Sequence, residues 1–198
     1  MKLFSIMVLY KGATKVTILK SASDLSSFGY FQRSSVQEFM NFTSKIVVER
    51  TQQKLRSSVK EKDYIFHVMC RESNLAGVII SDSDYPPRVS FTLLNKVLEE
   101  FSNAVSPSTW PTLSENSAGY QGLEPYLVKY QNPSESDPMM RIQKDLDETK
   151  FIMHDTIESM LNRGEKLDDL VAKSDDLSAQ SKTFYKTARK TNSCCVLQ

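Results

Sequence analysis

The 198-residue sequence lacks the long apolar runs and the charge excess that mark several protein classes. Its longest strongly apolar stretch near the start, Leu3–Tyr10, is far shorter than the about 20 residues that a membrane-spanning helix needs. One lysine precedes this stretch and no cleavage site of small residues follows it, so we expect no signal peptide and no transmembrane helix. The formal net charge of +1 argues against a general nucleic-acid-binding protein.

Cysteine and histidine are also scarce. Three cysteines provide no disulfide framework, and Cys70 lies in an apolar run, as a core strand residue does. His67 and His154 lack the spacing of metal ligands. We expect His67 to be a strand residue and His154 to be a solvated helix residue. No phosphate-binding loop and no nucleophile motif is present. The sequence therefore predicts a cytosolic protein that is no enzyme and holds no metal or cofactor.

Residues 1–131 show alternating strand-like and helix-like patterns. Helices are predicted from Ser35 to about Arg50, opened by a capping box of Ser35 and Glu38, and over Val89–Val105. Residues 106–132 are less regular, with one short element. Short polar connections favour antiparallel hairpins. The five predicted strands are Lys2–Tyr10, Lys15–Leu19, Leu55–Lys60, Tyr64–Arg71 and Leu75–Ser81. We predict an α+β domain, a five-stranded antiparallel sheet with helices on its faces.

The pattern changes after a linker predicted at residues 132–138. Residues 139–192 contain no proline, and their apolar residues recur at alternating spacings of three and four, which predicts a long coiled-coil helix that needs partner helices. We call these recurring positions the seam. The seam residues are Met139, Ile142, Leu146, Thr149, Met153, Thr156, Met160, Arg163, Leu167, Leu170, Ser174, Leu177, Ser181, Phe184, Ala188 and Thr191.

Arg163 is unusual because it lies at the centre of this seam, between Met160 and Leu167. A buried guanidinium is costly unless its donors are satisfied. One interpretation is a polar residue that only sets the register of the coiled coil. The other is that partner helices present uncharged amide side chains in the same layer, which would satisfy the donors without adding charge.

With this centre, residues 139–191 resemble an R-SNARE motif, and the stretch from Leu161 to Leu170 is similar to the family's signature. The front part resembles a profilin-like longin domain. Together with the C-terminal cysteines, the resemblance points to the lipid-anchored longin R-SNAREs, synaptobrevin homologs of the YKT type. It implies that Arg163 forms the zero layer of a parallel four-helix bundle with three glutamine-SNARE helices, of syntaxin and other types. It also implies vesicle docking and fusion in ER–Golgi, Golgi and endosomal transport, on the cytoplasmic face of these membranes.

The last residues, 193–198, carry a lipidation pattern. Cys195-Val196-Leu197-Gln198 fits a prenylation motif, and the terminal Gln favours farnesyl on Cys195, with a methyl ester after trimming. Because one lipid chain gives only marginal attachment, Cys194 is predicted to carry a palmitoyl group or another second lipid. The basic residues Lys182, Lys186, Arg189 and Lys190 add a weak attraction to anionic headgroups. We expect reversible attachment to membranes.

The first predicted helix has surplus apolar surface at Phe39, Phe42 and Ile46. One interpretation is that the irregular residues 106–130 cover Phe42. The other is a groove for the seam or for the lipid on Cys195, which predicts a closed state with the coiled-coil segment broken into shorter helices on the front part and the lipid near Phe42. Ser174 and Ser181 either only tune seam packing or serve as phosphorylation switches, because a dianionic phosphate in a packed seam is strongly disruptive.

Two other function classes compete with a fusion protein. A lipidated tether would use the coiled coil only for docking, but it has no need of Arg163. An acyltransferase is the third class, since self-palmitoylation is attributed to the resembled family. No residue constellation in the sequence would carry that chemistry.

Overall fold

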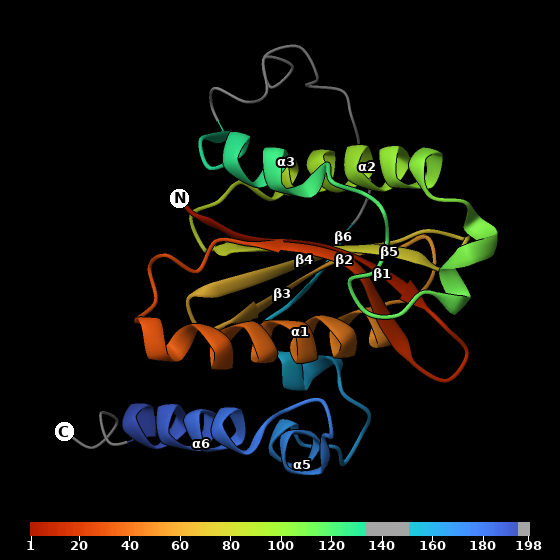
Figure 1. The fold of residues 1–198 in the computed structure, drawn as a ribbon. Coiled ribbons are helices and arrows are strands. Elements are labelled where there is room, and N and C mark those ends of the chain that lie inside the picture. Colours follow the sequence, from red (N-terminus) through yellow and green to blue (C-terminus); the bar gives the residue numbers. More distant parts are fainter. Residues whose placement is uncertain (134–150, 194–198) are drawn as a thin grey trace.

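We describe the protein from a computed structural model, which covers residues 1–133 and 151–193 (Figure 1). Its centre is a mixed sheet of six strands in the order β2-β1-β5-β4-β3-β6. The first five strands pair antiparallel, and β6 joins the edge of β3 in the parallel direction. The strands are β1 (Leu3–Lys11), β2 (Val16–Ser23), β3 (Arg56–Glu61), β4 (Tyr64–Cys70), β5 (Leu75–Asp82) and β6 (Phe151–His154).

Helices cover both faces of the sheet. Figure 1 shows α2 and α3 on one face and α1 on the other, with α5 and α6 outside α1. The helices are α1 (Arg33–Arg50), α2 (Pro87–Ala104), α3 (Leu123–Lys129), α5 (Leu167–Lys173) and α6 (Ala179–Ser193), with 3-10 turns η1 (Tyr30–Gln32), η2 (Pro107–Thr112) and η4 (Ile157–Met160). We call residues 1–133 the front domain and residues 151–193 the C-terminal segment. Among the described helices, none combines the length and apolarity needed to cross a bilayer.

Strand β1 explains why the sheet is buried on both faces. Successive side chains of a strand point to opposite faces. Ile6 and Val8 accordingly join the core beneath α2, while Met7 and Leu9 join the core beneath α1. All four side chains are fully buried, so β1 reads as a continuous apolar run.

The predicted capping box at the start of α1 is wrong. The helix begins at Arg33, so Ser35 lies inside it and is 3% exposed, and the N-cap residue Gln32 makes no side-chain capping bond. The reason is the preceding turn η1, whose backbone leads directly into the helix and moves its start before Ser35. The C-terminal end at Arg50 agrees with the prediction.

Helix α2 packs closely on β5 because a glycine faces it. A Cβ atom on Gly77 would lie 2.8 Å from Leu94 Cδ2 and 3.3 Å from Leu98 Cδ2. Glycine at this strand position therefore lets the leucine stripe of α2 rest on the backbone of the sheet. Both leucines are fully buried.

The buried side chains of the irregular region after α2 lie on the α2 side of the molecule, whereas its Glu115 is paired with α1, through Lys45. Trp110 is 3% exposed and donates from Nε1 to the carbonyl of Val105 at 3.1 Å. The backbone N–H groups of Asn116 and Ala118 donate to β2 at 2.8 and 3.2 Å, which covers that edge of the sheet. Phe42 lies in the core beneath α1, on the opposite face. The interpretation that residues 106–130 cover Phe42 is therefore wrong.

The sheet has one strand more than the five predicted, and it is mixed rather than purely antiparallel. The additional strand, β6, comes from the heptad region, where the pattern predicts helix. An edge strand such as β3 offers unpaired backbone groups, and β6 satisfies them over Arg56–Val59. His154 therefore ends a strand and is half-buried, and its prediction as a solvated helix residue is wrong.

Candidate partner-binding surface

The C-terminal segment runs along α1 of the front domain in the antiparallel direction. Arg50, at the end of α1, contacts Glu165, and Glu38, near its start, contacts Ser178. Phe39 then stacks on Tyr185 of α6, with ring centroids 5.2 Å apart. Figure 1 shows the same arrangement, with α5 and α6 lying against the outer side of α1. We call this set of contacts the docked arrangement.

Apolar burial is the main stabilising contribution to the docked arrangement. Ile157 of η4 is fully buried, and Leu167, Val171 and Leu177 are 4%, 1% and 4% exposed. All four join the core that lies beneath α1. Fully burying one such side chain contributes roughly 1.5–3 kcal/mol, so together they outweigh the polar contacts around them.

Polar contacts set the register of the docked segment. The guanidinium of Arg50 donates from Nη2 to both oxygens of Glu165, at 3.2 and 3.0 Å. Lys45 donates from Nζ to Asp176 at 2.8 Å and also pairs with Glu115. Burial alone would lower the pKa of Lys45, but its bonds to Asp176 and Glu115 raise it. The ammonium therefore stays charged between two carboxylates from distant parts of the chain.

A carboxylate of α1 accepts a hydrogen bond at the N-terminal end of helix α6. Ser178 donates its backbone N–H to Glu38 Oε2 at 2.8 Å, and its hydroxyl bonds to Ser181 at 3.1 Å. Burial would raise the pKa of Glu38, but these serine hydrogen bonds lower it. A negative charge next to the first turn of a helix also suits the helix dipole.

The structure divides the seam into buried and exposed parts. Leu167, Leu177 and Ser181 are buried, and Arg163 is exposed. Met153 and Thr156 are exposed as well, whereas Met160, Leu170, Ser174, Phe184 and Ala188 are half-buried. The seam residues Met139, Ile142, Leu146 and Thr149, and both tail cysteines, Cys194 and Cys195, lie outside the described residues. Of the predicted linker, only residues 132 and 133 are described.

Two buried residues of the docked arrangement are absent from the seam. Ile157 and Val171 each follow a seam position by one residue, and they lie two heptads apart. In a heptad repeat, positions that follow the seam by one residue lie beside the packed interface rather than within it. The available signal was the type of side chain, since both residues are β-branched and apolar at positions outside the seam.

An apolar cavity of about 390 Å³ lies between α1, the sheet and the C-terminal segment. Phe39 and Met40 form its α1 wall, Tyr64 its sheet wall, and Phe184 and Ala188 its α6 wall.

Of the three residues predicted to form a groove, only Phe39 lines this cavity. Phe42 and Ile46, both 8% exposed, line a second hollow next to Leu170 and Ser174. The surplus apolar surface of α1 therefore meets the C-terminal segment at two separate places.

Two family models match the chain and divide it at the same place as the fold. The Longin model, described as a regulated-SNARE-like domain, matches residues 25–127, and the Synaptobrevin model matches residues 138–198. Among curated relatives, Synaptobrevin homolog ykt6 of Schizosaccharomyces pombe is 51% identical over 197 residues. Synaptobrevin homologs YKT6 of Eremothecium gossypii and Saccharomyces cerevisiae are 49% and 45% identical over 199 residues. Each match covers 100% of this chain and 100% of the relative.

The chain belongs to the YKT6 family of synaptobrevin homologs. It is therefore a vesicular R-SNARE, with a longin front domain followed by a synaptobrevin region. The resemblance inferred from the sequence is confirmed at the level of the family, and so is the α+β class of the fold.

The longin R-SNARE family is not one of classical enzymes. Ser58 and His67 form a hydrogen bond of 2.8 Å between Oγ and Nδ1, with the two residues 1% and 0% exposed. Burial lowers the pKa of His67 to about 4, so the ring is neutral. Burial also raises the pKa of the Cys70 thiol to about 11. Within the described residues, no three His, Cys, Asp or Glu side chains are grouped to hold a metal.

Proposed function

We propose that this R-SNARE forms a parallel four-helix bundle with three glutamine-SNARE helices, and that the docked arrangement is its autoinhibited closed state. The bundle would dock and fuse vesicles in ER–Golgi, Golgi and endosomal transport, on the cytoplasmic face of these membranes. A farnesyl group on Cys195 and a palmitoyl group or other second lipid on Cys194 would attach the chain reversibly. The protein would divide between the cytosol and these membranes.

The mutual exclusion of docking and bundle assembly supports this proposal most strongly. Leu167, Leu177 and Ser181 are seam residues, and their side chains are already buried against the front domain. A bundle would require the same side chains to face partner helices. It would also require a continuous helix through Phe151–His154, which is strand β6 here. The chain therefore cannot hold both conformations at once.

Arg163 distinguishes a fusion SNARE from a lipidated tether. Its side chain is exposed in the docked arrangement, so the front domain gives no reason for a guanidinium at the centre of the seam. In a bundle, amide oxygens from three partner helices would accept its hydrogen bonds and fix the register. A tether that uses the coiled coil only for docking would gain nothing from this residue.

The cavity beside Phe39 is the proposed site for the lipid of the cytosolic form. Its α6 wall includes Phe184 and Ala188, which lie ten and six residues before Cys194. A lipid chain that stays in water loses roughly 25 cal/mol for each Å² of exposed apolar surface. Placing it in this cavity would remove that penalty and would add to the stability of the docked arrangement.

Phosphorylation of Ser181 or Ser174 is a proposed means of opening. Ser181 is 1% exposed and lies in the hydrogen-bonded group that includes Ser178 and Glu38. A phosphate carries a charge of about −1.5 to −2 and would repel the Glu38 carboxylate next to it. Ser174 is half-buried next to Phe42, where a phosphate would have to be desolvated. A kinase would reach Ser181 only after local undocking, and the modified chain would not dock again.

The proposed function is tested by mixing the purified chain with glutamine-SNARE helices. We expect a complex that resists SDS and melts far above the free chain, because four seams bury one another. Failure to form any such complex with a panel of syntaxin-type and other glutamine-SNAREs would leave the tether as the better description.

A further inference from the structure

Two aromatic side chains project from the front domain without cover. Tyr30 and Phe31 are 78% and 86% exposed, whereas the next most exposed aromatic side chain of the described residues is Phe151 at 43%. Their rings touch edge to face, with centroids 5.5 Å apart. They form the 3-10 turn that leads into α1. We call this pair the aromatic tip.

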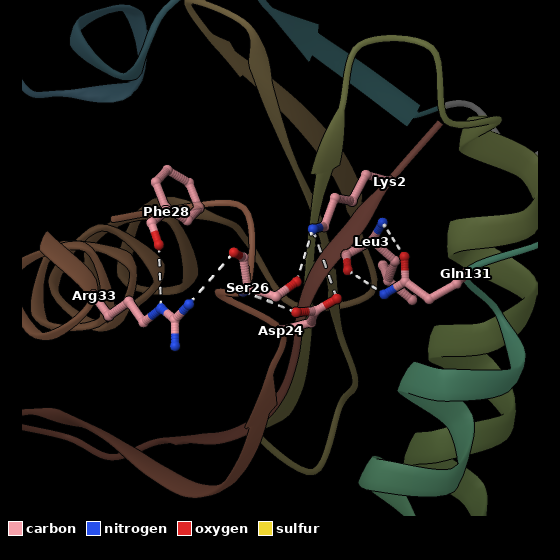
Figure 2. Close-up of polar contacts among 7 residues, drawn as sticks. All are labelled: Lys2, Leu3, Asp24, Ser26, Phe28, Arg33 and Gln131. Carbon is pink, nitrogen blue, oxygen red and sulfur yellow. Dashed lines mark hydrogen bonds and ion pairs between the residues drawn. The ribbon is translucent and has the colours of Figure 1, made fainter. Parts of the chain in front are cut away.

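Polar contacts hold the loop that carries the aromatic tip (Figure 2). Arg33 donates from Nε to the carbonyl of Phe28 at 3.1 Å and from Nη2 to the carbonyl of Ser26 at 3.4 Å. Asp24 accepts the backbone N–H of Ser26 at 3.0 Å, and Lys2 donates to the hydroxyl of Ser26 at 3.3 Å.

An aromatic contact with strand β1 also holds this loop. The Phe28 ring packs against Phe4, with centroids 5.8 Å apart. Phe28 thus turns inward while Tyr30 and Phe31, two and three residues later, turn outward. The tip therefore projects from a loop that both polar and aromatic contacts hold in place.

The aromatic tip lies close to the end of the chain that is proposed to carry lipid. Phe28 lines the same cavity as Phe184 and Ala188 of α6, and α6 ends at Ser193, directly before the tail cysteines. Figure 1 shows the start of α1 and the end of α6 at the same end of the molecule. Helix α6 contains no acidic residue, and Lys182 and Lys186 give it positive charge.

We propose that the aromatic tip is a membrane-contact element, with Tyr30 and Phe31 inserting into the headgroup region of the bilayer to which the lipidated tail attaches. This inference rests on the proposed lipid attachment. Aromatic rings are favoured at membrane–water interfaces, where one side of the ring is apolar and the other wet.

Two features favour a lipid surface over a protein partner. A stable protein interface needs about 800 Å² from each partner, and two side chains on a projecting turn offer much less. The residues around the tip, Ser26, Ser27 and Gln32, are exposed and polar, which suits contact with headgroups. Lipid chains that bind marginally alone would gain a second, oriented contact from the tip.

The test measures where the tip lies when the full chain is attached to a bilayer by its tail. Cys194 and Cys195 are coupled to vesicles of phosphatidylcholine, phosphatidylserine and a maleimide lipid, while Cys70 is 3% exposed and its raised pKa keeps it unreactive. The Phe31→Trp variant carries an indole at the tip, and a brominated phospholipid quenches indoles that enter the bilayer. The native Trp110 is 3% exposed, so it provides a constant background.

The matched control is Val128→Trp, at a side chain that is 76% exposed on α3, on the opposite layer of the molecule. We expect quenching of the Phe31→Trp indole and none of the Val128→Trp indole. For the chain that carries both natural lipids, Tyr30→Ser with Phe31→Ser should speed release from vesicles by about tenfold, and Val128→Ser should leave it unchanged.

Equal quenching at both positions, or none at Phe31→Trp, would overturn the proposal. An unchanged release rate in the double serine variant would also overturn it. Because maleimide coupling replaces the natural lipids, a negative quenching result would contradict the aromatic tip alone. Failure of the lipid attachment itself would instead be seen as unmodified cysteines in the purified cellular protein.

Discussion

Replacing Ile157 and Val171 together by alanine should open the docked arrangement without removing a bundle layer. Both side chains are buried against the front domain, at 0% and 1% exposure. Neither belongs to the seam, because each follows a seam position by one residue. Alanine is the strongest helix former, so the double variant should still build the SNARE helix. The two changes therefore separate docking from assembly.

The magnitude follows from the buried carbon atoms that are lost. Ile157→Ala removes three carbons and Val171→Ala removes two, at about 0.8 kcal/mol for each buried methylene. The sum is about 4 kcal/mol before any cavity contribution, and every 1.4 kcal/mol is tenfold in an equilibrium constant. The ratio of docked to undocked chain should fall by about three orders of magnitude.

The assay compares assembly rates with a fixed set of glutamine-SNARE helices, and small-angle scattering reports the compactness of the free chain. We expect the double variant to assemble faster than the wild type and to have a larger radius of gyration. Leu167→Ala is the informative contrast, since it weakens both docking and a bundle layer. The matched control is Ile152→Ala, the same chemical change at an off-seam side chain that is 45% exposed.

Two results would refute this reasoning. Unchanged assembly and compactness in the double variant would mean that burial of Ile157 and Val171 does not restrain the C-terminal segment. An acceleration of the same size in Ile152→Ala would mean that the effect does not come from the burial of Ile157 and Val171.

Three further predictions concern single residues. Arg163→Leu should leave the compactness of the free chain unchanged, because the side chain is exposed there, but in a bundle it should cost about 1–3 kcal/mol for each acceptor left unpaired, measured by the melting of the complex. Cys195→Ser should make the protein fully cytosolic on fractionation, and Cys194→Ser should leave only weak, transient attachment; stable attachment of Cys194→Ser would rule out the need for two lipids. Burial lowers the pKa of His67 from 6.5 to about 4, so the unfolded state takes up a proton first as the pH falls. Stability should be full above pH 6.5 and should decline by up to about 3 kcal/mol towards pH 4, a decline that thermal melts of His67→Gln should lack.

Strand β1 and helix α2 of the front domain were predictable, because each of their hydrophobic patterns fits only one type of secondary structure. The apolar run of Leu3–Tyr10 and the leucine stripe of Val89–Val105 appear as β1 and α2 with boundaries shifted by one or two residues. The start of α1 was not predictable from its capping signal, because Ser35 and Glu38 fit the rule but the turn Tyr30–Gln32 decides where the helix begins. Tertiary context overrides such local signals.

The C-terminal segment shows the limit of reasoning from periodicity. The heptad pattern describes the helix that a bundle would need, and nothing in Phe151–His154 indicates that these residues pair with a strand. That pairing depends on the vacant edge of β3, which lies almost a hundred residues earlier in the chain. The buried positions Ile157 and Val171 were missed for the same reason, since the front domain buries these neighbours of the seam together with the seam residues Leu167 and Leu177.

The central claim, that docking and bundle assembly exclude each other, is tested most directly by locking the docked arrangement. Lys45 and Asp176 touch at 2.8 Å between Nζ and Oδ2, so Lys45→Cys with Asp176→Cys can be joined by a short, cleavable bis-maleimide. Cys194→Ser and Cys195→Ser remove the competing thiols, and Cys70 is buried. The linked chain should form no SDS-resistant complex with glutamine-SNARE helices, and cleavage of the linker should restore assembly. Assembly of the linked chain at the rate of the cleaved chain would contradict the claim.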